Sequence, residues 1–205
     1  MAQDTSGIKA LLSTPSMYDL AQILMGAHAN RVWLQREFIR AQTGDRILDV
    51  GCGTAAILSV LPDVDYTGFD ISKPYIASAQ KRWGDRGQFH AQLLNDEVIE
   101  GLDKFDLILA TGLLHHLDDD EAHALFKTLS KGLKQNGRII TVDGTYIPDQ
   151  RFLSRFIIQQ DRGKSVRSPE GYLALARDHF PTLKGHLVER QWIPYTYWIM
   201  QIGNE

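Results

Sequence analysis

The chain has 205 residues, of which 43% are hydrophobic and 23% are charged, and its formal net charge is -3. This size and balance are typical of one globular domain, and the weak charge excludes a general attraction to nucleic acid or to an anionic membrane. The chain has no apolar run of the roughly 20 residues that span a bilayer, no signal-peptide pattern at its N-terminus and a single cysteine, Cys52. We therefore expect a cytoplasmic protein without membrane insertion, nucleic-acid partner or internal disulfide.

Helix and strand patterns alternate along most of the chain. Apolar residues at helical spacing predict one or two helices over residues 17–41. Strands are then predicted at 46–51, 65–70, 88–93, 105–112 and 138–144, and helices at 54–61, 72–83 and 118–133. Ser72 is a candidate helix cap, and Asn136-Gly137 predicts a turn before the fifth strand.

The pattern changes after Gly144. Residues 146–167 form an insertion with a short helix predicted at 149–160, and another helix starts at Ser168-Pro169 and runs to about Phe180. Two β-rich runs, 186–192 and 195–202, predict a terminal hairpin. Arg167 ends the short basic run RGKSVR, which we expect to be a solvated surface.

The alternation predicts an α/β fold, a Rossmann-like, doubly wound sheet of seven strands with helices on both faces. The sheet is expected to be mostly parallel, with an antiparallel hairpin at its C-terminal end. We expect a single domain over 1–205, made of an N-terminal helical cap (1–44), a cofactor-binding core (45–145), an insertion or cap (146–167), and a final helix with the hairpin (168–205).

The run Arg46–Gly53, RILDVGCG, carries the strongest functional signal. Gly51 and Gly53 permit a sharp turn and the close approach of a ligand. Asp70 ends the second apolar run, where a carboxylate can accept the hydroxyls of a ribose. Asp49 lies where a dinucleotide-binding fold keeps an apolar residue, because a phosphate binds nearby. A carboxylate there favours a ligand that has a positive charge and no phosphate.

Four segments, LDVGCGT, FDIS, FDLILATGLLHHL and LKQNGRIITVD, resemble in their order and spacing the motifs of class I S-adenosylmethionine-dependent methyltransferases. The resemblance implies methyl transfer from S-adenosyl-L-methionine to the O, N or C of a small-molecule acceptor. It implies that the cofactor is bound by Asp49, Gly51, Cys52, Gly53, Asp70, Ile71, Leu93, Leu94, Ala110 and Thr111. Two features depart from the family: Ala55 replaces a frequent third glycine, and leucines stand where many members carry an acid near adenine.

His115 and His116 are the candidate catalytic residues. They follow the fourth strand, and a histidine there could remove the acceptor's proton as a general base. The alternative is a histidine that only packs or bonds the backbone. Cys52 is expected to be a small loop residue rather than a nucleophile. The aspartates 118–120 are expected to cap the next helix, and no metal site is predicted.

Substrate contacts are expected from parts outside the common sheet, namely Tyr18, Tyr146, Arg151 and Arg155. Aromatic and arginine side chains suit an apolar or anionic small molecule, although core packing explains the aromatics equally well. Two other functions stay open. One is a non-catalytic protein that binds S-adenosylmethionine. The other is an NAD-dependent oxidoreductase. Residues 51–56 loosely match the glycine fingerprint of that class, but Asp49 disfavours it.

Overall fold

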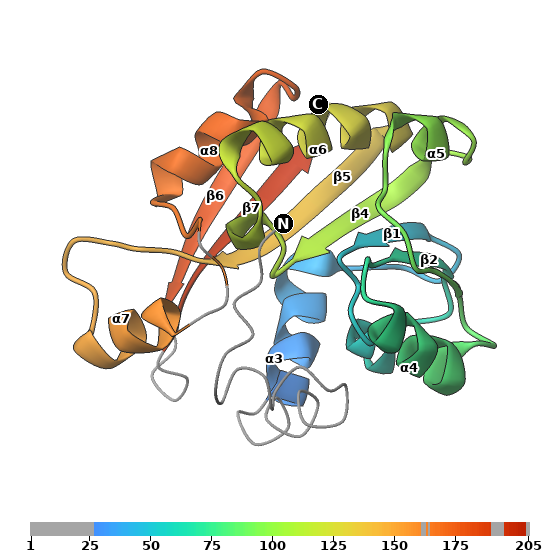
Figure 1. The fold of residues 1–205 in the computed structure, drawn as a ribbon, viewed down its shortest axis with the longest axis horizontal. Coiled ribbons are helices and arrows are strands. Elements are labelled where there is room, and N and C mark those ends of the chain that lie inside the picture. The colour runs from blue at the N-terminus through green and yellow to red at the C-terminus, as the bar shows by residue number, and fades with distance from the viewer. Residues whose placement is uncertain (1–26, 161–162, 164, 190–194, 204–205) are drawn as a thin grey trace. The chain divides into compact units, whose positions relative to one another are not determined.

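A computed structural model describes residues 27–160, 163, 165–189 and 195–203. Its strands form a seven-stranded sheet of order β3-β2-β1-β4-β5-β7-β6 (Figure 1). The pairs β1–β2, β2–β3 and β4–β5 are parallel, and β7 is antiparallel to both β5 and β6. The predicted Rossmann-like α/β sheet with a C-terminal antiparallel hairpin is therefore confirmed. The chain divides into two compact units, essentially residues 4–93 and 94–205.

The described part of the first unit, residues 27–93, contains three short parallel strands and two α-helices. The strands are β1 (Arg46–Val50), β2 (Asp65–Phe69) and β3 (Gln88–His90), and the helices are α3 (Ala27–Leu34), which continues into a π-helical turn (Gln35–Ile39), and α4 (Lys73–Trp83). Four consecutive residues of β1 and of β2 are buried, as expected for strands covered on both faces. Strand β3 is three residues long, shorter than the predicted 88–93.

The helix predicted at 54–61 is wrong. Only a 3-10 turn forms, over Ala56–Ser59. The reason is Ala55, whose backbone is in the left-handed region at φ 52° and ψ 35°. A right-handed helix cannot run through a residue in that conformation, so no helix starts at Thr54.

Among its described residues, the second unit combines four strands with four α-helices. They are, in chain order, α5 (Asp96–Glu100), β4 (Phe105–Thr111), α6 (Asp119–Gly132), β5 (Leu133–Gly144), α7 (Phe152–Gln159), α8 (Pro169–Arg177), β6 (Thr182–Glu189) and β7 (Thr196–Gly203). A 3-10 turn, Leu114–His116, lies between β4 and α6. Helices α6 and α8 lie on the same face of these strands (Figure 1).

Several boundaries in this unit differ from the prediction. Strand β5 begins at Leu133, so the predicted turn at Asn136-Gly137 lies inside it. The β4–β5 register explains this, because Phe105 pairs with Leu133 and Leu107 with Arg138, which leaves the intervening β5 residues as a bulge. Helix α8 ends at Arg177, before Phe180, and the short helix α5 was not predicted.

Helix α6 begins where its sequence predicts. The Asp118 side chain accepts from the Glu121 backbone N–H, and the Glu121 side chain accepts from the Asp118 N–H, which forms a capping box. The predicted capping role of this acidic run is confirmed for Asp118.

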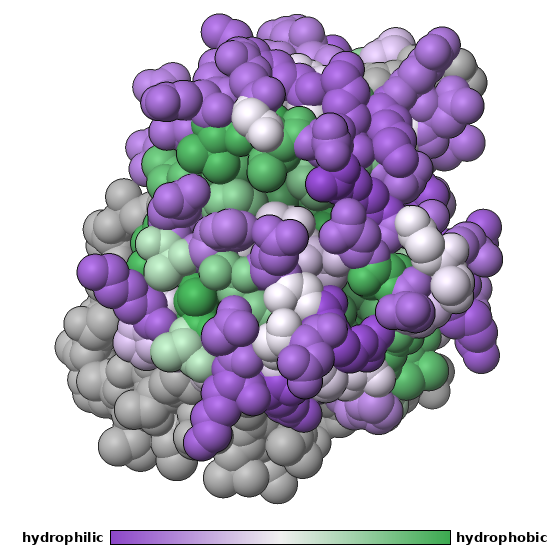
Figure 2. All heavy atoms as spheres, turned by 90° about the vertical axis from the view of Figure 1, so that its right-hand side faces the viewer, coloured by the Kyte–Doolittle hydropathy of each residue, from purple (hydrophilic) through white to green (hydrophobic). Residues whose placement is uncertain are grey.

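Hydrophilic side chains cover most of the face shown in Figure 2, and hydrophobic side chains show in patches between them. Within the ranges that the structure describes, no helix has both the length and the apolar character to cross a membrane.

Candidate functional site

The loop after β1 is folded against the end of β2. The backbone N–H groups of Gly51 and Cys52 donate to the Phe69 carbonyl oxygen at 2.8 and 3.0 Å. The Gly53 N–H donates to Asp70 Oδ2 at 2.9 Å. Gly51 and Gly53 have φ values of 73° and 54°, and no atom of the described residues lies within 4 Å of the position that a Cβ of Gly53 would occupy. The structure thus brings the predicted glycines and Asp70 together around open space that a ligand can approach.

Asp49 is a buried carboxylate, and only one of its two oxygens is hydrogen-bonded within the described residues. It is 2% exposed, and its Oδ2 accepts from the Tyr66 hydroxyl at 2.6 Å. Its Oδ1 is buried and has no hydrogen-bond partner among the described residues. The pKa of Asp49 is raised to about 7, because burial and, to a lesser extent, the charge of Asp70 raise it by more than the Tyr66 hydrogen bond lowers it. A cationic ligand group would satisfy both the free oxygen and the charge.

Asp70 has a structural role in addition to its predicted role in ligand binding. Its Oδ1 accepts from the Ser72 N–H at 2.7 Å, while the Ser72 side chain makes no cap hydrogen bond to α4. Asp70, rather than the predicted Ser72, is therefore the side chain that binds a backbone N–H at the start of α4. A carboxylate has about four acceptor sites, so two backbone donors leave capacity for hydroxyls of a ligand.

Two large apolar side chains are exposed near the ends of β2 and β3. Ile71 is 49% exposed and Leu93 is 60% exposed. Such side chains can pack against a flat aromatic group. Leu94, by contrast, is buried and belongs to the second unit. The predicted binding residues Ile71 and Leu93 are thus accessible, and Leu94 is not.

Sequence reasoning missed two residues of this unit. The Tyr66 hydroxyl donates a hydrogen bond to Asp49, and the His90 ring stacks on Phe69 with ring centroids 4.7 Å apart. The Nε2 of His90 is buried and has no hydrogen-bond partner among the described residues. His90 ends β3 and pairs with Phe69, and this position at a strand end was the available signal. Cys52 packs against Gly68, where an added Cβ would lie 2.8 Å from its Sγ. Burial and the charges of Asp49 and Asp70 raise the pKa of the Cys52 thiol, which disfavours the nucleophilic thiolate.

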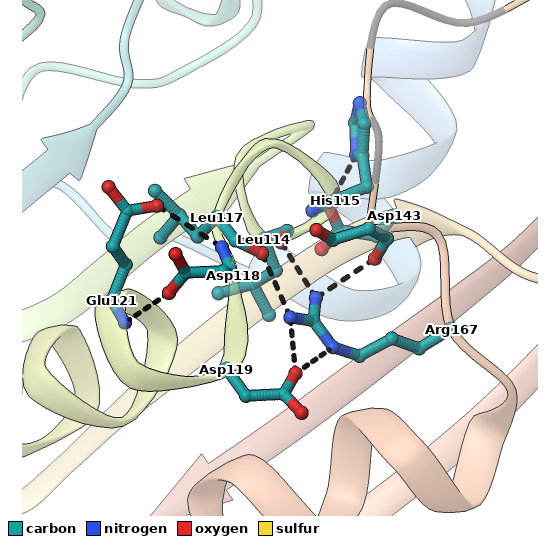
Figure 3. A network of polar contacts seen from close by, with 9 residues as sticks. Leu114, His115, Leu117, Asp118, Asp119, Glu121, Asp143 and Arg167 are labelled. Carbon is teal, nitrogen blue, oxygen red and sulfur yellow. Dashed lines mark hydrogen bonds and ion pairs between the residues drawn. The ribbon is translucent and has the colours of Figure 1, made fainter. Parts of the chain in front are cut away.

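In the second unit, His115 and His116 differ in burial and in their contacts. Ala110 and Thr111 end β4, Gly112 follows with φ 70°, and the next turn holds both histidines. His115 is 5% exposed, and its Nδ1 lies 2.8 Å from Asp143 Oδ1. The same oxygen accepts from the His115 backbone N–H at 3.2 Å (Figure 3). His116 is less buried and its ring lies against that of His115, with centroids 4.2 Å apart.

The Asp143 carboxylate sets the chemistry of the His115 ring. An ionised carboxylate only accepts hydrogen bonds, so we assign the proton to Nδ1, which leaves Nε2 as the basic nitrogen. Gly163 packs on the ring, because a Cβ there would lie 2.1 Å from His115 Cδ2. Asp143 Oδ2 is itself buried and has no partner among the described residues. His115 is thus a histidine held in one orientation, with one nitrogen suited to accept a proton.

Arg167 corrects the prediction that RGKSVR is a solvated surface. Its side chain is 11% exposed and forms an ion pair with Asp119 Oδ1 through Nη2 at 2.7 Å. Its Nη1 donates to the Leu114 carbonyl at 3.0 Å and its Nη2 to the Leu117 carbonyl at 2.8 Å (Figure 3). It therefore binds both ends of the turn that contains His115.

Two of the predicted substrate residues lie together. The Arg155 guanidinium lies 5.4 Å from the Tyr146 ring centroid, which is a cation–π contact. Arg151 is exposed and precedes α7. Helix α7 also exposes Phe152, at 84%, so the insertion presents aromatic and cationic side chains. Tyr18 lies outside the described residues.

Comparison with known proteins gives a consistent result. Residues 48–139 match a family model described as a methyltransferase domain. An O-methyltransferase of Aspergillus sclerotiorum is 30% identical over 128 residues, which are 58% of this chain and 48% of that protein. The structure of mitomycin 7-O-methyltransferase aligns with a TM-score of 0.68 at 19% identity, over 94% of this chain and 59% of the other. A complex named DhpI-SAH aligns with a TM-score of 0.63 at 22% identity, over 93% and 92%.

The chain spans between a fifth and about half of the length of the curated relatives that it matches. The solved structures are under 25% identical and therefore support the fold. The chain is therefore similar in sequence to the methyltransferase-domain family over residues 48–139, and it has the fold of the solved structures named above over most of its length.

Proposed function

We propose that this protein transfers a methyl group from S-adenosylmethionine to an oxygen of a small-molecule acceptor, with His115 as the general base. The observation that carries the proposal is the buried His115–Asp143 pair, in which Nδ1 is held and Nε2 is left basic. Similarity to proteins named O-methyltransferases supports oxygen as the acceptor atom. A hydroxyl acceptor must lose its proton, and this is the step that a positioned histidine accelerates.

The residues of the first unit fit the cofactor. Asp49, with its unpartnered Oδ1, would bind the ammonium group, and Asp70 would accept the ribose hydroxyls. Ile71 and Leu93 would pack on the adenine. Gly51, Cys52 and Gly53 would line the methionine part. When bound, the cofactor would supply a methyl group on a sulfonium sulfur, and its leaving group would be a neutral thioether.

The chain's own residues then move one proton. Nε2 of His115 would take the proton of the acceptor hydroxyl as the acceptor oxygen receives the methyl group. Asp143 stabilises the imidazolium that results, through the hydrogen bond to Nδ1. A general base of this kind contributes about 10²- to 10⁴-fold in rate.

The insertion is proposed to bind the acceptor. Tyr146, Arg151 and Arg155 offer an aromatic face and two cations, which suit an aromatic or apolar acceptor with an anionic group. We also propose a single domain over 1–205, a cytoplasmic location and no nucleic-acid partner. A non-catalytic binding protein and an NAD-dependent oxidoreductase are the alternatives that the experiments below distinguish from this proposal.

The cofactor is tested by calorimetry with S-adenosylhomocysteine and NAD. Micromolar binding of S-adenosylhomocysteine without binding of NAD is the expected result, and the reverse would refute the proposal. Turnover is then measured with radiolabelled S-adenosylmethionine and a panel of phenols, enols and carboxylic acids. Binding without transfer to any acceptor would favour the non-catalytic alternative.

The base is tested by a matched pair of variants. His115→Gln should lower turnover by about 10²- to 10⁴-fold with unchanged cofactor affinity. His116→Gln should stay close to wild type, because the carboxylate contacts His115. The wild-type rate should also fall in acid, where histidine becomes protonated. Two variants with wild-type turnover would remove histidine from the mechanism and leave positioning alone.

A further inference from the structure

Three backbone carbonyl oxygens of the His115 turn accept hydrogen bonds from one short segment, Ser165–Arg167. The carbonyl oxygens of Leu114 and Leu117 accept from Arg167 Nη1 and Nη2. The carbonyl oxygen of His115 accepts from the Ser165 N–H at 3.0 Å. Arg167 Nη1 also donates to the Ser165 carbonyl at 2.9 Å, so the guanidinium joins this segment to the turn.

The backbone of Arg167 is held as well. Its carbonyl oxygen accepts from Thr145 Oγ1 at 2.9 Å and from the Tyr146 N–H at 3.3 Å. Thr145 follows β5 directly, two residues after Asp143. One residue therefore connects the end of the strand that carries Asp143 with the turn that carries His115.

We propose that Arg167 is a positioning residue, which holds the turn so that the His115 ring keeps its Nδ1 on Asp143 and presents Nε2 to the acceptor. This inference rests on the proposed role of His115. Arg167 touches neither His115's ring nor a reacting atom in the described contacts; it acts through the two carbonyls that flank the histidines.

An arginine suits this position better than a lysine. The planar guanidinium spans two carbonyls and the Asp119 carboxylate at once, whereas an ammonium is a point charge without that fork. Hydrogen bonds from a cation to carbonyls are strong when the cation is shielded from water. The Arg167 side chain is shielded, while its partner Asp119 has 76% of its side chain exposed. The carbonyl contacts, rather than the exposed ion pair, should therefore position the turn.

The first test measures the ring itself in the cofactor-free protein. Long-range proton–nitrogen NMR on histidine-labelled protein reports which ring nitrogen carries the proton, and His115→Gln assigns His115 among the seven histidines. Wild type should show the Nδ1–H form. Arg167→Met and Arg167→Lys should show a mixture of both forms, and the matched control Asp119→Asn should resemble wild type. Melting curves confirm that each variant is folded, and Arg167→Lys carries the test if Arg167→Met does not fold.

The second test is a double-mutant cycle on turnover with the best acceptor of the phenol, enol and carboxylic-acid panel. Arg167→Lys should lower kcat by about 10- to 100-fold, the cost of an angstrom-scale misplacement. KM for S-adenosylmethionine should stay within about twofold. In a His115→Gln background the same substitution should change kcat by less than about twofold, because the residue that it positions is gone.

The outcomes separate the two proposals. An unchanged His115 tautomer in folded Arg167 variants overturns the positioning role, whatever the turnover. Equal losses of kcat in the wild-type and His115→Gln backgrounds also overturn it, since Arg167 would then act without His115. If His115→Gln keeps full turnover while the Arg167 variants disturb the ring, the base assignment fails and the positioning of His115 stands.

Discussion

Replacing Asp49 with asparagine should stabilise the cofactor-free protein at high pH and weaken cofactor binding. The carboxylate is buried, and only one of its two oxygens is bonded. Asn keeps an oxygen for the Tyr66 hydroxyl and cannot carry a charge. The variant therefore removes the cost of ionising a group in a desolvated position.

The magnitude follows from the pKa. Burial raises the pKa of Asp49 from 3.8 to about 7, and each unit of pKa corresponds to about 1.36 kcal/mol. Between these values the unfolded chain has released the proton and the folded chain still holds it, so the free energy of unfolding falls as pH rises. The fall totals up to about 4 kcal/mol between pH 4 and pH 7 and then levels off. Asp49→Asn lacks this fall, so its advantage over wild type should grow across the same window.

The assay is urea unfolding of both proteins at pH 4, 5, 6, 7 and 8, without cofactor. The change of the difference with pH is the test, because a fixed cost of the amide contributes equally at every pH. Calorimetry with S-adenosylhomocysteine should show release of close to one proton on binding to wild type at pH 6, and none for the variant. At pH 8 the variant should bind about 1.5–3 kcal/mol more weakly, the range for a hydrogen bond to a charged group. A stability difference that is equal at pH 5 and pH 8 would refute the reasoning.

Three further substitutions test the first unit. Asp70→Ala should weaken S-adenosylhomocysteine binding by about 1.5–3 kcal/mol. It should also lower the free energy of unfolding by about 1 kcal/mol, because both oxygens of Asp70 accept from backbone N–H groups. A loss of stability with unchanged affinity would show that Asp70 is only a structural cap. Ala55→Gly relieves a left-handed conformation worth about 1–2 kcal/mol and loses a buried methyl worth about 0.8 kcal/mol. Denaturant unfolding should therefore change by less than about 1 kcal/mol, and a loss above 2 kcal/mol would contradict the assigned conformation. Tyr66→Phe removes the hydrogen bond that lowers the pKa of Asp49, so calorimetry should find proton release on binding at a higher pH than in wild type; an unchanged pH profile would speak against that bond.

The alternation of apolar strand patterns with helix patterns was sufficient to predict the sheet. A buried strand needs consecutive apolar residues, and two parallel strands need a connection, usually a helix, that returns the chain to the start of the sheet. Local chemistry was likewise sufficient at the Asp118 cap, whose partners lie three residues away. Glycines and acids at strand ends predicted the loop around Gly51, Gly53 and Asp70 for the same reason, since strand direction alone determines where those residues emerge.

Local patterns failed where one residue changed the backbone. Ala55 in the left-handed region replaced a predicted helix with a short turn, and the β5 bulge absorbed a predicted turn. Neither the conformation of an alanine nor the register of two strands is visible in hydrophobic spacing, because both depend on the packing of the finished sheet.

Partners distant in sequence were decided by the tertiary structure alone. Asp143 lies 28 residues from His115, and Arg167 lies 53 residues from Leu114. The sequence could nominate both histidines and could not separate them, because the carboxylate that distinguishes His115 arrives from another strand. A periodicity specifies which face of an element is buried, whereas the pairing of one side chain with another depends on register and packing across the fold, and it is the pairing that turns a buried histidine into a candidate base.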